Sequence, residues 1–322
     1  MLVVVYPSEE DNVPSLVKNP RFIEIIKPVF QMIKTIPGYK EVDVSMWFLL
    51  FFSIFFGMLI GDAGYGAIFF IINLFCHIKF RNKVKDKSIF FLTYILSAAT
   101  IAWGVLSGTF FGQAYLPERV GPLLPYLRDN MNVQALCFFI GAAHLSIAHI
   151  WKFLRKFPSL KAFSEVGWIA ILWGANFLAR SLILGEVFAS FGKWLFIGGA
   201  GLIILFTNPS KNILKSCGSG IGNFLLNIIN SFTDVVSYIR LFAVGAATVA
   251  VADAFNQMAL EVGQGSVVMG LVTALILFFG HTLNILLGAM AVLVHGVRLN
   301  VLEFSSHLDM EFSGVEYAPF KE

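Results

Sequence analysis

Seven long apolar stretches constrain the fold of this chain more than any other feature of its sequence. They run over residues 46–78, 88–111, 133–151, 166–184, 187–206, 221–260 and 266–302. Of the 322 residues, 57% are hydrophobic and 13% are charged, whereas soluble domains average about 25% charged residues. Charges this sparse cannot cover a water-soluble fold, so lipid must be the main solvent. Because lipid leaves backbone groups to bond one another, the stretches predict an all-α polytopic membrane protein.

The first stretch, residues 46–78, raises a question of topology because basic residues flank it on both sides. A single crossing would put one basic flank outside, against the positive-inside tendency. Two shorter helices that turn at the glycine-rich segment 61–66 would keep both flanks inside. We favour this hairpin, and a single tilted helix is the alternative. The hairpin gives about eight membrane helices with both termini cytoplasmic.

The same topology divides the rest of the chain. Residues 1–45 form a polar segment, and residues 46–322 form the membrane domain. The basic loops at 152–161 and 211–215 fall on the cytoplasmic side. The loops at 113–132, 185–186 and around Glu261 fall on the outer side.

The last two stretches are long for single crossings, at about 40 and 37 residues. As helices they would extend some 55–60 Å, at about 1.5 Å per residue. Long helices fit a thinner bilayer by tilting or by projecting from it. We predict that both tilt strongly, which would let them follow the surface of a curved partner.

Two arginines lie inside these last stretches. Arg240 is near the middle of its stretch, and Arg298 is nearer the cytoplasmic end of its own. An arginine within the membrane costs at least roughly 2.5–3.5 kcal/mol and marks a functional site by default. Its charge is permanent, so it attracts a carboxylate and repels a cation but does not relay protons. The alternative is snorkelling of the side chain to the headgroups. The sequence predicts that Arg240 and Arg298 line an ion pathway.

Other polar residues gather on one face of each of the last two helices at helical spacing. Arg298 shares its face with them, and Arg240 lies about 80° from Ser237, at the edge of the other face. The candidates for lining the pathway are Asp234, Ser237, His281, Asn284, His295 and Glu303. Glu303, just past Arg298, is predicted to line a cytoplasmic entrance. For Ser237, Asn284 and Thr248 the alternative is helix-to-helix hydrogen bonding.

The turn at residues 61–66 has its own polar group. Gly61, Gly64 and Gly66 suit a sharp turn, and Asp62 is predicted to cap the helix that follows, since aspartate accepts backbone N–H bonds there. No matching break is evident in the second half of the chain.

The remaining polar groups point to no further chemistry. His144 and His149 are five residues apart with no carboxylate nearby in sequence, which favours packing or interface roles. Cys76, Cys137 and Cys217 have no paired spacing and are expected to be buried thiols. No nucleotide, nucleophile or zinc motif occurs, so no cofactor or metal is expected and the chain should hydrolyse nothing itself. The net charge of +3 is scattered, which argues against nucleic acid.

Three strings resemble a known family, in its order along the chain. Residues 231–243 (SFTDVVSYIRLFA) and 295–304 (HGVRLNVLEF) look like the last two helices of V-type ATPase subunit a, called subunit I in prokaryotes. Residues 56–66 (FGMLIGDAGYG) match that family's first membrane motif, and the short segments 39–43 and 317–320 also fit. The resemblance covers the carboxyl-terminal membrane domain, without the family's cytosolic domain.

Two positions depart from the eukaryotic members of that family. Gly288 and Thr248 stand where eukaryotic relatives carry a glutamate and a histidine. The departure favours a prokaryotic type, and it puts in doubt any half-channel scheme that needs those two groups.

The resemblance implies a stator beside a rotating ring of proteolipid subunits (c or K), each bearing one carboxylate. Two offset half-channels would pass H⁺ or Na⁺, coupled to ATP hydrolysis or synthesis, in a prokaryotic plasma membrane. Arg240 and Arg298 would face the ring. Further implied partners are the central-stalk connector (d or C) and the peripheral stalks. The alternatives are a secondary transporter with a midplane site and a passive assembly scaffold.

Overall fold

The computed structural model describes residues 13–39, 41–84, 86–112, 122–206, 213–263 and 265–317, with only the backbone described for 213–223 and Glu316. Several predicted features lie partly outside the described residues: the polar segment at 1–12, the loops at 113–121 and 211–212, and the family-like segments at Lys40 and 318–320. The side chain of Cys217 also lies outside them.

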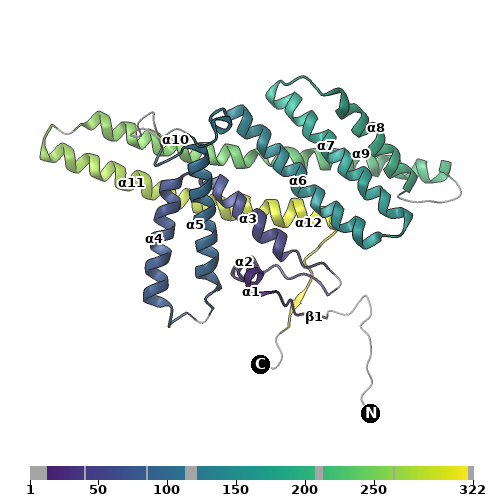
Figure 1. The fold of residues 1–322 in the computed structure, drawn as a ribbon, viewed down its shortest axis with the longest axis horizontal. Coiled ribbons are helices and arrows are strands. Elements are labelled where there is room, and N and C mark those ends of the chain that lie inside the picture. Colours follow the sequence, from purple (N-terminus) through teal and green to yellow (C-terminus); the bar gives the residue numbers. More distant parts are fainter. Residues whose placement is uncertain are drawn as a thin grey trace, which may run out of the picture.

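The described chain is almost entirely helical (Figure 1). Its α-helices are α1 (Arg21–Glu24), α2 (Lys27–Ile33), α3 (Ser45–Ile60), α4 (Ala63–Phe80), α5 (Ser88–Ser107), α6 (Asn130–Lys156), α7 (Phe163–Leu184), α8 (Ser190–Phe206), α9 (Ile213–Ser237), α10 (Ile239–Val262), α11 (Val267–Ala291) and α12 (Ser305–His307). Two 3₁₀ turns, η1 (Pro125–Arg128) and η2 (Leu160–Ala162), and two π-helical segments, η3 (Val292–Gly296) and η4 (Leu299–Phe304), complete the helices. Two-residue strands β1 (Pro14–Ser15) and β2 (Val315–Glu316) pair in parallel.

Six described helical segments are long and apolar enough to cross a membrane. They are Ala63–Phe80, Ser88–Ser107, Asn130–Lys156, Leu160–Leu184, Phe224–Val262 and Val267–His307. Helices α3 and α8 are apolar but shorter. The polytopic all-α fold is therefore confirmed, whereas the predicted count of eight depends on those two short helices and stays a prediction.

The predicted break in the first stretch is present between α3 and α4. Gly61 ends α3 with φ of 70°, a left-handed conformation that glycine adopts at no steric cost. The Asp62 carboxylate then accepts the backbone N–H of Gly64 at 2.7 Å and of Tyr65 at 3.2 Å, which caps α4 as predicted. The two helices do not lie along each other. Instead α4 pairs with α5, and α3 packs against α5 and α10.

The last two stretches run across the other helices. In Figure 1, α9 and α10 form one long path, α11 and the segments after it form a second, and both cross α4 and α5 at a steep angle. Relative to α4 and α5 the long segments are steeply inclined, and their predicted strong tilt in the membrane stays a prediction.

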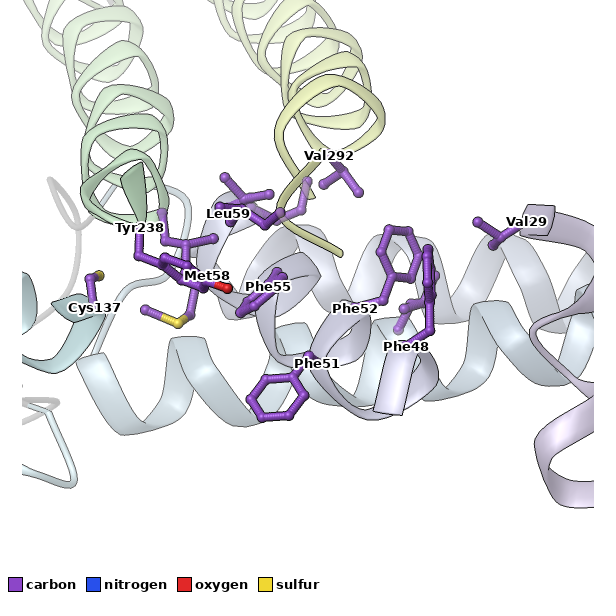
Figure 2. Close-up of a cluster of buried hydrophobic side chains, with 14 of the residues drawn as sticks. Val29, Phe48, Phe51, Phe52, Phe55, Met58, Leu59, Cys137, Tyr238 and Val292 are labelled. Carbon is purple, nitrogen blue, oxygen red and sulfur yellow. The ribbon is translucent and has the colours of Figure 1, made fainter. Parts of the chain in front are cut away.

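The core is built around α3. Figure 2 shows Phe48, Phe51, Phe52 and Phe55 of α3 among side chains from several other segments. Tyr238, at the junction of α9 and α10, belongs to this cluster and is fully buried. Helix α3 therefore holds the middle of the penultimate stretch in place.

The segments nearest both ends of the described chain lie on one side of the molecule. In Figure 1, α1, α2 and β1 lie toward the same side as the turn between α4 and α5. Ile26 and Val29 anchor this region, because both join the core cluster around α3.

Candidate functional site

A break in the helix at Tyr238 positions Arg240. Helix α9 ends at Ser237 and α10 begins at Ile239. The Leu241 N–H donates to the Tyr238 carbonyl, three residues back, so it leaves the Ser237 carbonyl free. The Arg240 guanidinium Nε donates to that carbonyl at 2.9 Å. The break thus leaves a backbone carbonyl available to bind the guanidinium group of Arg240.

Arg240 and Arg298 converge on one buried carboxylate, that of Glu303. Arg240 Nη2 lies 2.6 Å from Glu303 Oε1, and Arg298 Nε lies 3.5 Å from the same oxygen. Ser237 Oγ is 3.4 Å from it. Glu303 is 5% exposed, while the side chains of Arg240 and Arg298 are 23% and 55% exposed. Two fixed positive charges therefore share one negative charge, and the side chains of both arginines remain partly exposed at the surface of the chain.

The second oxygen of Glu303, Oε2, is buried and has no hydrogen-bond partner among the described residues. A buried carboxylate oxygen without a partner is costly, so such groups call for a functional explanation.

Two π-helical segments lie on either side of Arg298. They are η3 before Val297 and η4 after Arg298. A π-helix forms i→i+5 hydrogen bonds, so it brings a residue over the one five positions on. Arg298 and Glu303 are five apart, and in a regular α-helix they would point about 140° from each other. The π segment lets them meet.

His144 holds the Tyr238 side chain at the helix break next to Arg240. Its Nδ1 is 2.7 Å from the Tyr238 hydroxyl, and its ring stacks between Phe51 and Phe304 with centroids 3.9 and 4.3 Å away. The residue is fully buried. The predicted packing role of His144 is therefore present, and the partner it holds is two residues from Arg240.

His281 and Asn284 lie in a separate polar cluster. The Tyr65 hydroxyl is 2.7 Å from His281 Nδ1 and accepts a hydrogen bond from Asn284 Nδ2 at 3.0 Å. Asn284 also donates to the Thr248 carbonyl at 2.8 Å. This cluster ties α4, α10 and α11 together beside the Asp62 cap, which matches the helix-to-helix role considered for Asn284 and Thr248.

The sequence candidates thus fall into two groups and a remainder. Arg240, Arg298, Ser237 and Glu303 meet directly, while His281 and Asn284 meet around Tyr65. His295 joins neither group, and its buried Nδ1 has no partner among the described residues.

Asp234 is bonded to a residue that the sequence analysis did not select. Its Oδ2 lies 3.1 Å from His307 Nε2. His307 Nδ1 lies 2.9 Å from His149 Nε2, and His149 Nδ1 lies 2.7 Å from Glu165 Oε2. The expectation that His149 has no carboxylate nearby is wrong. Glu165 reaches it from the next helix, across a turn that sequence spacing does not reveal.

The arrangement carries charge without a built metal site. Within the described ranges, no group of three or more His, Cys, Asp or Glu side chains is placed to hold a metal ion. Two guanidinium groups and one carboxylate leave an excess of positive charge, suited to a mobile carboxylate from outside.

Comparisons with known proteins agree with the resemblance seen in the sequence. The chain is 39% identical over 98% of its length to a protein of Borreliella burgdorferi named V-type ATP synthase subunit I, and covers 55% of that protein. It is 35% identical over 99% of its length to V-type ATP synthase subunit I 1 of Treponema pallidum, covering 54% of it. It is 29% identical over 92% of its length to A-type ATP synthase subunit I of Pyrococcus horikoshii, covering 46% of it. The chain thus spans about half the length of these relatives. No protein-family model matches it.

Proposed function

Across 98% of its length this chain belongs to the family of V-type and A-type ATP synthase subunit I, and on that premise we propose that it is the ion-translocating stator of a rotary membrane motor. It would work in a prokaryotic plasma membrane beside a ring of proteolipid subunits. The ring, the central-stalk connector and the peripheral stalks would be its partners. Nucleotide chemistry would take place on other subunits of the complex.

The observation that carries the proposal is the placement of Arg240. It lies on a long, steeply crossing helical path, fixed by a helix break and by Glu303, with its side chain 23% exposed. A permanent charge at such a place can pair with each ring carboxylate that arrives without its ion. It also repels a cation that would cross directly from one half-channel to the other.

Glu303 gives this charge a resting partner. When no ring carboxylate is present, Arg240 pairs with Glu303 at 2.6 Å. A ring carboxylate that arrives ionised competes with Glu303 for the guanidinium group, and Glu303 takes the guanidinium back when the ring carboxylate binds its next ion. The exchange keeps the arginine paired throughout the cycle.

The outer face of α11 supports a partner that is apolar. Leu275, Phe278 and Leu286 are 55%, 64% and 59% exposed along it. Exposed side chains of this kind suit lipid or a proteolipid surface. Polar groups of the same helix, His281 and Asn284, face inward instead.

The test is Arg240→Ala in the full-length subunit, assembled with its partners in inverted membrane vesicles. We expect normal assembly with the ring and loss of ATP-driven ion uptake. The control is Arg180→Ala, because Arg180 forms a two-point pair with Glu186 at 2.9 Å at an exposed position and should leave uptake unchanged. Ion uptake that survives Arg240→Ala would refute the stator proposal.

Arg298→Ala ranks the two arginines. Because Arg298 is more exposed and lies farther from Glu303, we expect a milder loss of uptake than in Arg240→Ala. A larger loss would reverse the ranking. Exchange of a labelled solute by the purified subunit without a ring would favour a secondary transporter instead.

A further inference from the structure

Four titratable side chains form one unbranched chain of hydrogen bonds outside the arginine site. Their order is Asp234 of α9, His307 of α12, His149 of α6 and Glu165 of α7. The three contacts measure 3.1, 2.9 and 2.7 Å. Four different elements contribute one residue each, so the chain depends on the tertiary fold.

These groups are shielded from water except at the Asp234 end. The side chains of His149, Glu165 and His307 are 5%, 3% and 8% exposed, whereas that of Asp234 is 26% exposed. The His149 ring also stacks on Trp168. Water therefore reaches the inner bonds poorly, and the groups must satisfy one another.

The number of protons in the chain is the decisive feature. Three hydrogen bonds need three protons. A neutral imidazole carries one N–H and an ionised carboxylate carries none, so two neutral histidines and two ionised carboxylates supply only two. Without a third proton, the facing nitrogens of His149 and His307 would present lone pairs to each other at 2.9 Å. The geometry therefore requires one extra proton within the chain, on an imidazole or on a carboxyl group.

The two ends of the chain lie in different surroundings. Asp234 is six residues before Arg240, or about 9 Å along the helix, and its carbonyl accepts a hydrogen bond from Ser237, which also lies 3.4 Å from Glu303. At the other end, Glu165 pairs with Lys156, whose side chain is 42% exposed.

Four other charged or titratable groups lie near this chain of hydrogen bonds: Lys152, Asp309, Lys156 and His144. Lys152 pairs with the exposed Asp309 at 2.6 Å, and Lys156 pairs with Glu165. His144 precedes His149 by five residues on α6. The positive groups gather at the Glu165 end. One end thus approaches the stator arginine, and the other is a buried carboxylate paired with Lys156, whose side chain reaches water.

We propose that Asp234, His307, His149 and Glu165 form a proton relay between the Arg240 site and the lysine-rich side of the protein, so that the transported ion is a proton. This proposal depends on the proposed stator function, because it supplies a path to and from the ring carboxylate. A row of imidazole nitrogens can pass a proton along its hydrogen bonds but offers Na⁺ no comparable route.

The transfer conserves protons. One proton released near the arginine site binds to Asp234, and each bond of the chain shifts its proton by one position. Each histidine gains a proton at one ring nitrogen and loses one from the other. One proton leaves the Glu165 carboxyl for water beside the partly exposed Lys156, so the relay holds three protons before and after. Reorientation of the two rings returns it to its first state, whereas the reverse sequence of shifts carries a proton in the opposite direction.

The experiment measures ATP-driven proton uptake by inverted vesicles that contain the full-length subunit in its complex, without added Na⁺. His149→Gln keeps a hydrogen-bonding side chain but cannot accept a proton on one atom while releasing one from another. We expect its initial rate of uptake to fall by at least about tenfold, as for lost general acid–base groups. Added imidazole should partly restore uptake in His149→Ala, which a purely structural role would not allow.

His77→Gln is the matched control, since His77 is a histidine of α4 that is bonded to Tyr94 at 3.2 Å and lies outside the relay. It should leave uptake unchanged. If His149→Gln blocks assembly, His307→Gln and Asp234→Asn break the same chain at other bonds.

Several results would overturn the relay. Uptake retained in any assembled relay variant, or uptake that requires Na⁺, would do so. The stator proposal stands or falls separately with Arg240→Ala, so loss of uptake there with normal uptake in His149→Gln would refute the relay alone.

Discussion

The guanidinium group of Arg240 is held at two points. Its Nε bonds the Ser237 carbonyl, and its Nη2 bonds Glu303. The first contact belongs to the same helical path, and the second comes from the end of the chain. The position of the Arg240 guanidinium group therefore depends on the distant segment that carries Glu303, and a change at Glu303 should shift it.

Glu303→Gln tests that dependence, because glutamine keeps the shape of the side chain and removes its charge. We expect a loss of roughly 3 kcal/mol in the free energy of unfolding, the low end for removal of one partner of a buried ion pair, because both arginines are partly exposed. ATP-driven ion uptake should also fall. Thermal unfolding of the purified complex in detergent and uptake by vesicles are the measurements.

Glu186→Gln provides the comparison, because Glu186 pairs with Arg180 at the surface. Exposed pairs contribute at most about 1 kcal/mol. Equal effects of the two substitutions would contradict the special role of Glu303.

Helical elements were the easiest features to predict. The apolar stretches give α5, α7, α8 and α11 to within about three residues at their starts, because membrane helices need long uncharged runs. The break at Gly61 and the Asp62 cap also follow from residue type. The break at Tyr238 does not, since neither proline nor glycine marks it.

The meeting of Arg298 and Glu303 could not be predicted from α-helical spacing. An angle of 100° per residue places the two side chains far apart. The structure joins them through η4, whose residues LNVLEF carry no signal for a π-helix. Both residues were predicted from the sequence to be functional, but their contact was not predicted.

The Asp62 cap at the start of α4 can be tested by a single substitution. Its carboxylate is 1% exposed, caps α4 through two backbone N–H groups, and also accepts the Gly112 N–H at 3.2 Å. Asp62→Ala should cost about 1–2 kcal/mol for the cap, and more for the buried N–H of Gly112 left without a partner. The shift of thermal unfolding in detergent measures it.

Asp129→Ala is the matched control, because Asp129 caps α6 through Met131 at 2.9 Å at an exposed position. Water can replace that cap, so the loss should be smaller. A loss as large as that of Asp62→Ala would contradict the role given to burial.

On the scale of the whole molecule, the helices divide the chain between two sides. Figure 1 places the turn between α4 and α5 on the side of α1 and β1, and the connection between α7 and α8 at the opposite edge. The basic residues of that first turn favour the cytoplasmic side.

The relay of Asp234, His307, His149 and Glu165 also exists only at the scale of the whole molecule. Its members are 73, 158 and 16 residues apart in successive pairs, so no local pattern could predict it.

Single cysteines test the sidedness, in a chain whose own three cysteines are replaced by alanine. Lys83→Cys, in the turn after α4, should react with a membrane-impermeant maleimide in inverted vesicles but not in intact spheroplasts. Val187→Cys should show the opposite pattern, since Val187 is 96% exposed beyond the end of α7. Reaction of both from one side would contradict the topology, and an exchanged pattern would reverse the orientation.

The π-helical segment after Arg298 has a consequence for how this chain tolerates changes of length. Because η4 brings Arg298 and Glu303 together by its wider turn, their contact depends on this local helix geometry. If the same residues formed a regular α-helix, the two side chains would point about 140° apart, and the pair would be separated although every charged side chain was still present. A deletion of one residue between them would have the opposite effect, because it would leave the arginine and the glutamate four positions apart, on the same face of a regular α-helix. At this position, the number of residues matters as much as their chemistry.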